Sequence, residues 1–226
     1  MKQLQTIRKS LESYLGTSYR REKIDAILEQ NRHLYRGIVL DIGGRDRGNF
    51  KKPKNSVQQW IFADIVEDFN PDMLLDVTDM KTIQTSSIDT VNAIELFEHV
   101  RYPEKGISEC FRILKTGGTF IASTPFLYGI HADPYDFQRW TEDKWKSVLK
   151  DIGFSKITVI PMGTCVSTSL DMIKGILRYS TPPLKFISFL FYPILDLLEK
   201  MDSVNFIKKS ICGKYVGGYF ITAQKQ

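Results

Sequence analysis

The chain has few of the residues that build metal sites and disulfide frameworks. Among its 226 residues are three histidines and three cysteines, and no CxxC pair occurs. The cysteines are Cys110, Cys165 and Cys212, far apart in the sequence. This spacing argues against a disulfide-stapled fold and against structural zinc. We therefore expect reduced thiols, an intracellular protein and no metal site.

Long apolar runs are also scarce. Residues Met1–Gln5 lack the apolar core of a signal peptide, so we expect a cytoplasmic protein. The most apolar run, residues 184–198, is interrupted by Pro193 and Asp196 and is too short to span a bilayer. With 42% hydrophobic residues, 25% charged residues and a net charge of +5, the composition fits one soluble domain with appendages. The positive charge mildly favours anionic partners.

What the chain does contain is a buried strand that leads into a glycine turn. The run Ile38–Asp41 leads into Gly43 and Gly44, and a second apolar run, Trp60–Ala63, ends in Asp64. A strand, a glycine turn and an acid at the tip of the next strand are typical of sites for adenosine-containing cofactors. We expect such a cofactor here.

One part of a dinucleotide site is missing. Residues 49–59 contain Pro53 and no apolar stripe, so we predict an irregular basic loop where a first crossover helix would lie. No GxGxxG motif occurs either. A pyrophosphate group would then lack its helix N-terminus, which disfavours a nucleotide-cofactor oxidoreductase.

Helical spacing alternates with short apolar runs along most of the chain. Two helices are expected within residues 1–34 with a break at 16–18, another from Pro103 to Gly117–Gly118, and another from Thr141 to Gly153. The apolar runs predict strands at 38–42, 60–63, 73–77, 90–94, 119–124, 154–160 and 219–223. Such alternation indicates a parallel sheet covered on both faces.

Five segments together resemble the class I S-adenosylmethionine-dependent methyltransferases, in particular the type 11-like group with an E-x-x-E-H signature. In family order they are Val39–Gly43, Ala63–Asp64, Asp76–Met80, Glu95–Val100 and Arg112–Gly118. The resemblance implies an α/β, Rossmann-like, seven-stranded, mostly parallel sheet with helices on both faces. The corresponding units are an N-terminal helical extension (1–36), the cofactor-binding core (37–163), a helical insertion (164–212) and the last strand of the core (213–226).

The same resemblance implies a site for S-adenosyl-L-methionine. Gly43 and Gly44 would let the backbone approach the methionine end without Cβ clashes. Asp41 would orient this loop and face the cofactor's ammonium group, the alternative being a cap for the turn. Asp64, followed by Ile65, would accept hydrogen bonds from the ribose hydroxyls, the alternative being a solvated loop acid.

The remaining cofactor contacts are assigned to residues on or just after the next two predicted strands. Asp76, with the Val77 backbone, would recognise the adenine edge, and Asp79 competes for this role; either could instead cap the next turn. Glu95 would face the methionine moiety and the sulfonium. His99, one turn further if this segment is helical, is architectural more often than chemical in such proteins.

The glycine turn departs from the family pattern. The usual D-x-G-x-G-x-G has Arg45 and Arg47 in place of two glycines. We expect both side chains to point outward, because the acids that suit a cationic cofactor are all present.

A polar and aromatic segment follows the fifth predicted strand. Residues 131–141 resemble a segment of methyltransferases from cell-surface polysaccharide assembly. We take His131 as the general base, because its ordinary pKa lies near neutrality, with Asp133 or Asp136 orienting it or serving instead and Tyr135 a further candidate. The alternative is a structural lid, with Arg139 paired to an acid and Trp140 in the core.

The insertion allows two interpretations. The apolar residues 184–200, flanked by Arg178, Lys185, Lys200, Lys208 and Lys209, fit an interfacial helix on anionic lipid at the inner face of the membrane. A helical cap over the active site, or a dimer face, is the alternative.

These observations predict methyl transfer to an oxygen of a sugar, glycan or other small molecule, free or lipid-linked. An RNA methyltransferase is a rival, suggested by Arg45, Arg47, Lys51, Lys52 and Lys54. No Pro-Pro-Tyr/Phe motif follows the fourth strand and no cysteine lies in a nucleophile context, so nucleic acid is a disfavoured partner. A non-catalytic protein with an altered glycine turn is the third possibility.

Overall fold

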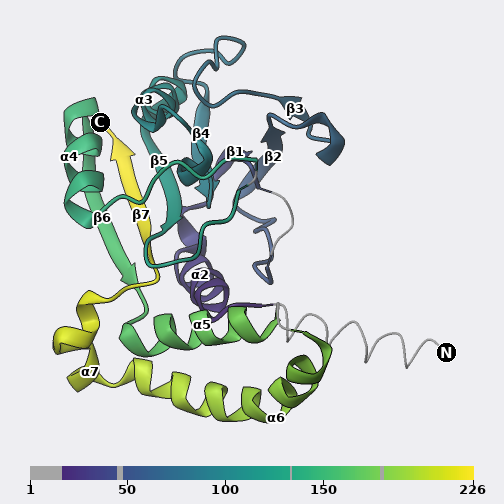
Figure 1. Cartoon of the computed structure of the whole chain (residues 1–226). Coiled ribbons are helices and arrows are strands. Elements are labelled where there is room, and N and C mark those ends of the chain that lie inside the picture. The colour runs from purple at the N-terminus through teal and green to yellow at the C-terminus, as the bar shows by residue number, and fades with distance from the viewer. Residues whose placement is uncertain (1–16, 45–47, 133, 179–180) are drawn as a thin grey trace.

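The computed structural model describes residues 17–44, 48–132, 134–178 and 181–226. Within these residues one seven-stranded sheet runs through the molecule in the order β3-β2-β1-β4-β5-β7-β6 (Figure 1). Its strands are β1 (Gly37–Ile42), β2 (Val57–Asp64), β3 (Met73–Leu74), β4 (Ile88–Ile94), β5 (Leu114–Pro125), β6 (Phe154–Met162) and β7 (Gly218–Lys225). The first five are parallel, and β7 is antiparallel to both of its neighbours. The predicted α/β class and mostly parallel sheet are confirmed.

Helices cover both faces of this sheet. On one face, α3 (Pro103–Ile113) and α4 (Glu142–Ile152) contribute Ile107, Cys110, Trp145 and Leu149 to the main core. On the other face, α2 (Tyr19–Gln30) packs Ile24 and Leu28 against Val39, Ile121 and Phe220. The second predicted helix begins after residues 16–18 as expected, with the Ser18 hydroxyl capping α2 by accepting the Arg21 N–H at 3.1 Å. The first predicted helix lies outside the described residues.

Two predicted boundaries were wrong. β3 ends at Leu74 rather than residue 77, because the Asp76 carboxylate accepts the backbone N–H and the hydroxyl of Thr78, both at 2.8 Å, and turns the chain. The helix that starts at Pro103 ends at Ile113, before the glycines that were expected to stop it. Leu114 is already extended and pairs with Ile88, so Gly117 and Gly118 lie inside β5.

No crossover helix joins β1 to β2 among the described residues 48–56, as predicted from Pro53 and the missing apolar stripe. The segment folds back toward α2 instead. Phe50 packs against the core between α2 and the sheet, and the Asn49 N–H donates to Asp25 of α2 at 2.7 Å. The basic loop is therefore fastened by α2, which occupies this side of the sheet.

The insertion is helical, as predicted. It comprises α5 (Cys165–Arg178), α6 (Pro182–Glu199), the 3₁₀ turn η4 (Lys200–Ser203), α7 (Asn205–Lys209) and η5 (Ile211–Lys214), with α5 and α6 side by side (Figure 1). Asp171 of α5 accepts the backbone N–H groups of Tyr19 and Arg20 at 2.7 and 2.9 Å. The insertion thus holds the first turn of α2 in place. Among the described residues, no helix is both long and apolar enough to cross a bilayer.

Candidate active site

A cavity of about 360 Å³ opens at the carboxyl ends of β1 and β4. The cavity is lined by Asp41, Gly43 and Gly44 at the end of β1, by Asn92 and Ile94 of β4, and by Glu95, the residue that follows β4. Phe50, Lys51, Lys52 and Trp60 from the basic loop and β2, with Arg21 and Leu28 of α2, form further walls. The glycine turn that stood out in the sequence therefore borders a real cavity, and α2 borders it as well.

Asp41 is held rigidly at the cavity wall. Its carboxylate is buried, with 2% exposed, and accepts hydrogen bonds from Trp60 Nε1 at 2.8 Å and Asn92 Nδ2 at 2.6 Å. Asn92 is in turn fixed by the Tyr35 hydroxyl, which donates to its amide oxygen at 2.8 Å. Lys52 Nζ lies 3.9 Å from the carboxylate. The Lys52 ammonium group therefore already faces Asp41.

Both glycines of the turn are required by geometry. Gly43 has φ +69°, a conformation that side chains disfavour, and its N–H donates to Ala63 of β2 at 2.8 Å. A Cβ on Gly44 would lie 2.0 Å from the Asp41 carboxylate. The turn and the acid therefore lie in direct contact, and the orienting role of Asp41 stays a prediction. Arg45 and Arg47 lie outside the described residues.

The predicted ribose and adenine residues lie along the same edge of the sheet but do not line this cavity. Asp64 ends β2, is 4% exposed, and accepts the Val66 N–H at 3.0 Å, while Ile65 beside it is exposed. Asp76 caps its own turn through Thr78, which is the alternative that the sequence left open. Asp79 is exposed and pairs with Lys81 at 3.2 Å, and Val77 is buried in the core.

Glu95 follows β4 in a left-handed conformation with φ +55°, so it does not share a helix with His99, a possibility that the sequence left open. Its buried carboxylate pairs with the Arg20 guanidinium of α2 and accepts the Ser123 hydroxyl at 2.8 Å. Burial would raise the pKa of Glu95, but the charge and hydrogen bond of Arg20 outweigh it and hold the pKa below its ordinary value. The acid is ionised and neutralised from within the chain.

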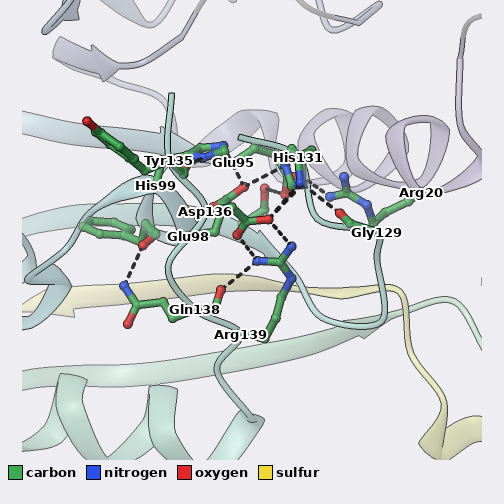
Figure 2. A network of polar contacts seen from close by, with 12 residues as sticks. Arg20, Glu95, Glu98, His99, Gly129, His131, Tyr135, Asp136, Gln138 and Arg139 are labelled. Atoms are coloured by element: carbon green, nitrogen blue, oxygen red, sulfur yellow. Dashed lines mark hydrogen bonds and ion pairs between the residues drawn. The ribbon is translucent and has the colours of Figure 1, made fainter. Parts of the chain in front are cut away.

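Three further side chains meet beside this pair (Figure 2). Glu98 and His99 belong to the 3₁₀ turn η3 (Phe97–His99), and His131 belongs to the loop after β5. Glu98 Oε1 lies 3.7 Å from His99 Nε2 and 3.9 Å from His131 Nε2. The Glu98 side chain is fully buried, and this burial, reinforced by the nearby Glu95 charge, raises its pKa well above the ordinary value. This trio is the part of the site that could hold a metal ion.

The loop after β5 is anchored by its acids and amides. Asp136 pairs with Arg139 and accepts the His131 backbone N–H at 3.0 Å (Figure 2). The hydrogen bond from Arg139 lowers the pKa of Asp136 to about 2. A carboxylate this acidic is a weak base, so Asp136 suits the role of orienting His131 better than that of the base. Trp140 is buried against Trp145, as the alternative of a structural lid required.

The other candidates of this loop have separate surroundings. His131 is half-buried, and this burial lowers its pKa, which keeps the imidazole neutral at pH 7 and able to accept a proton. Tyr135 exposes its ring beside Phe137, and its backbone carbonyl accepts from His99 Nδ1 at 2.6 Å. Asp133 lies outside the described residues.

Arg20 was not expected at the site, and no role was predicted for Glu98. Arg20 is 7% exposed, and it stacks over the Tyr128 ring at 4.3 Å besides pairing with Glu95. One signal was present: Arg20 lies four residues before Ile24 and eight before Leu28, in the apolar stripe of α2. A charged residue in such a stripe needs a buried partner.

Residues 49–122 match a family model described as a methyltransferase domain. No curated protein sequence matches the chain. Among solved structures, an S-adenosylmethionine-dependent methyltransferase from Archaeoglobus fulgidus aligns with a TM-score of 0.57 and 17% identity, over 96% of this chain and 99% of that one. Phosphoethanolamine N-methyltransferase 2 of Haemonchus contortus, in complex with S-adenosyl-L-methionine, aligns with a TM-score of 0.54 and 16% identity, over 89% and 52%.

The fold has more than one activity among these neighbours. The [4+2]-cyclase SpnF aligns with a TM-score of 0.58 and 13% identity, over 89% of this chain and 79% of that one. At these identities the likeness establishes the fold. The chain has the Rossmann-like fold of the class I methyltransferases, as predicted.

Proposed function

We propose that this chain is an S-adenosylmethionine-dependent methyltransferase. The observation that carries the proposal is the cavity at the carboxyl ends of β1 and β4, where buried Asp41 meets the glycine turn. In open α/β sheets this edge is where ligands bind. The match of residues 49–122 to a methyltransferase domain and the solved methyltransferases of the same fold support the same cofactor.

The residues present fit that cofactor. Asp41 would take its ammonium group in place of Lys52, and the backbone at Gly43 would border the methionine moiety. Trp60 and Phe50 provide aromatic walls. Bound here, S-adenosylmethionine supplies a methyl group already activated for in-line displacement. The protein then has to align the acceptor, a task worth roughly 7–11 kcal/mol, and to remove its proton.

We further propose that the acceptor atom is an oxygen of a sugar, glycan or other small molecule. The loop after β5 lies at the same edge of the sheet as the cavity and combines a neutral imidazole with exposed Tyr135 and Phe137 rings. Such rings offer faces on which a sugar can stack. Lys51 and Lys52, two of the residues that suggested RNA, line the cavity, and Lys52 lies over the Trp60 ring.

Isothermal titration tests the cofactor. We expect S-adenosylhomocysteine to bind with one molecule per chain and NAD not to bind. Methyl transfer would then be assayed with tritiated S-adenosylmethionine against sugar, glycan and RNA acceptors. Failure of S-adenosylhomocysteine to bind would leave a non-catalytic protein of this fold, and label in RNA alone would favour the nucleic-acid enzyme.

We also propose that the insertion rests on an anionic bilayer, which would place a lipid-linked acceptor within reach. Phe191, Ile194 and Leu197 recur along one side of α6 and are exposed, and Phe206 of α7 is 81% exposed. Apolar residues in such numbers are rarely left in water. Lys200, Lys208 and Lys209 are exposed beside them, which favours anionic headgroups. No residue that the structure describes in the insertion lines the cavity at the ends of β1 and β4, so a cap over that cavity is not supported.

A further inference from the structure

We infer that Glu98, His99 and His131 form a binding site for one divalent transition-metal ion, of the class of Zn²⁺ or Mn²⁺. The inference concerns three residues that the cofactor proposal does not use. It also departs from the expectation, drawn from the scarcity of histidine and the absence of CxxC, that the chain has no metal site. The sequence did not show that the loop after β5 brings His131 close to Glu98 and His99.

The hydrogen bonds of the two imidazoles leave the same ring atom available on each. His99 Nδ1 bonds the Tyr135 carbonyl at 2.6 Å, and His131 Nδ1 bonds the Gly129 carbonyl at 3.1 Å (Figure 2). A carbonyl oxygen only accepts, so each Nδ1 carries the proton and each Nε2 keeps its lone pair. Metal-ligating histidines commonly donate their second N–H to a backbone carbonyl in this way, which fixes the ring.

The two lone pairs meet a carboxylate to which no described residue donates a hydrogen bond. Within the described part of the chain neither Glu98 oxygen is hydrogen-bonded, although the side chain is fully buried. Buried carboxylates without partners are costly, so this one calls for a cation or a proton. Three acceptor atoms that face one another are satisfied together by a single metal ion.

The spacing of these atoms fits a first-row metal. The two Nε2–Oε1 separations are 3.7 and 3.9 Å, and all three ligand atoms lie within 4.8 Å of one another. Bond lengths of about 2.0–2.2 Å place neighbouring ligand atoms about 3.4 Å apart in a tetrahedral site. The two Glu98–histidine separations would need to contract by only a few tenths of an ångström to reach this spacing. Two imidazoles and one carboxylate form a ligand set known for catalytic zinc, with a fourth position open.

The backbone holds the three residues in register. The Phe137 N–H donates to the Glu98 carbonyl at 2.8 Å, and Gln138 Nε2 donates to the Phe97 and Val100 carbonyls at 3.1 and 2.6 Å. The loop that carries His131 is therefore hydrogen-bonded to the segment that carries Glu98 and His99. The nearby cations do not oppose an ion, because Arg20 is neutralised by Glu95 and Arg139 by Asp136.

The ion would serve the acceptor side of the reaction, an assignment that rests on the proposed function. The His131 side chain is 35% exposed, against 13% for His99, so the open position faces solvent on the side of the acceptor loop. A hydroxyl bound there would lose its proton to water more readily. Its oxygen would then form the new bond to the methyl group as the methyl–sulfur bond breaks and the electron pair returns to sulfur.

Direct metal binding tests the site. The full-length protein, stripped with a chelator, would be titrated with ZnCl₂ and MnCl₂ by calorimetry, and with CoCl₂ by visible absorption. We expect one ion per chain and a cobalt spectrum of low-coordinate nitrogen and oxygen ligation. Glu98→Gln and His131→Ala should each weaken binding about 100-fold or more, because even second-shell changes cost 10–100-fold. Far-UV circular dichroism would establish that both variants are folded.

The third histidine of the chain provides the matched control. His33 is exposed in the 3₁₀ turn η1 (Arg32–Leu34), and His33→Ala should bind metal as the parent protein does. Equal binding by the parent, Glu98→Gln and His131→Ala, or loss of binding in His33→Ala, would overturn the inference. S-adenosylhomocysteine binding is measured separately. If metal binds and S-adenosylhomocysteine does not, the proposed function is wrong and the metal site stands. If S-adenosylhomocysteine binds and metal does not, the metal site is wrong and the proposed function stands.

Discussion

At the scale of single residues, the site has two acids with different surroundings. Glu95 is ionised because Arg20 compensates its burial, whereas Glu98 has no such partner and its pKa is raised. Three positions separate them in the sequence, so their difference comes from what the fold brings to each. Asp41 is a third case, held by two neutral donors at the cavity wall.

The first prediction concerns Asp41. Asp41→Asn should weaken S-adenosylhomocysteine binding about tenfold or more, since a hydrogen bond to a charged group contributes about 1.5–3 kcal/mol. Calorimetry measures the affinity. Asp143→Asn, on the exposed first turn of α4, is the matched control and should bind normally. Equal affinity in both variants would remove Asp41 from the cofactor site.

The second prediction concerns His131. His131→Ala should lower turnover about 10²–10⁴-fold, the range expected for loss of a positioned base or of the ligand that replaces it. The affinity for S-adenosylhomocysteine should be unchanged, because His131 does not line the cavity at the ends of β1 and β4. Retained turnover would exclude His131 from the chemistry.

At the scale of secondary-structure elements, the boundaries depend on single residues. Helix α4 begins where the Thr141 hydroxyl accepts the Lys144 N–H, and it ends at Gly153 with φ +110°. Both ends follow standard capping chemistry, and both were predicted. The end of α3 was not, because Leu114 leaves the helix to pair with β4 three residues before the glycines.

Two glycines should respond in opposite ways to replacement. Gly153→Ala should lower the free energy of unfolding by about 1–3 kcal/mol, because a left-handed conformation is strained for alanine and its Cβ would crowd Phe111 at 3.3 Å. Gly175→Ala lies inside α5 in open space and should raise it by up to about 1 kcal/mol. Urea denaturation measures both, and the same sign for the two would contradict the capping argument.

The exposed apolar side of α6 and α7 makes a further prediction. The protein should sediment with phosphatidylglycerol-containing vesicles and not with neutral phosphatidylcholine vesicles. Leu197→Glu combined with Phe206→Glu should abolish this, whereas Leu74→Glu on exposed β3 should not. Absence of sedimentation with either vesicle would overturn the membrane proposal. A dimer that the double variant dissociates would assign the surface to a second copy instead.

At the scale of the whole molecule, a buried acid links the insertion to the rest of the fold. Asp202 of η4 accepts the Thr164 and Ser167 N–H groups at 3.0 and 3.1 Å, and pairs with Lys23 of α2 at 2.9 Å. Burial opposes its ionisation, but the hydrogen bonds from Thr164 and Lys23 outweigh it and lower the pKa of Asp202. Asp202 therefore joins two segments of the insertion to α2.

Acid should weaken this link. Because the folded-state pKa of Asp202 is lowered, its stabilisation is present above the unfolded pKa, near 4, and is lost as the pH falls through the lower folded value. Asp202→Asn should cost about 1.5–3 kcal/mol at neutral pH and show a shallower loss below pH 4. Denaturation between pH 7 and pH 3 measures both slopes. Exposed Asp151→Asn is the control, and parallel curves for Asp202→Asn and the parent protein would refute the link.

The sequence by itself determined the sheet, the glycine turn and the missing crossover helix. These features depend on local chemistry: apolar runs that must be buried, glycine at φ +69°, and Pro53 in a loop without an apolar stripe. Asp41 was identified for the same reason, since it stands two residues before Gly43 at the start of the turn. The turn at Asp76 was left open because its side chain could bind either a ligand or its own backbone.

The tertiary structure alone decided which charged residues meet. Arg20 reaches Glu95 across 75 positions, and His131 reaches Glu98 across 33, and no periodicity in the sequence relates either pair. Their contacts follow from how α2 packs on the sheet and how hydrogen bonds join the loop after β5 to the segment of η3. Long-range contacts of this kind depend on the placement of whole elements, so the sequence could name Glu95 and His131 but not the partners that the fold brings to them.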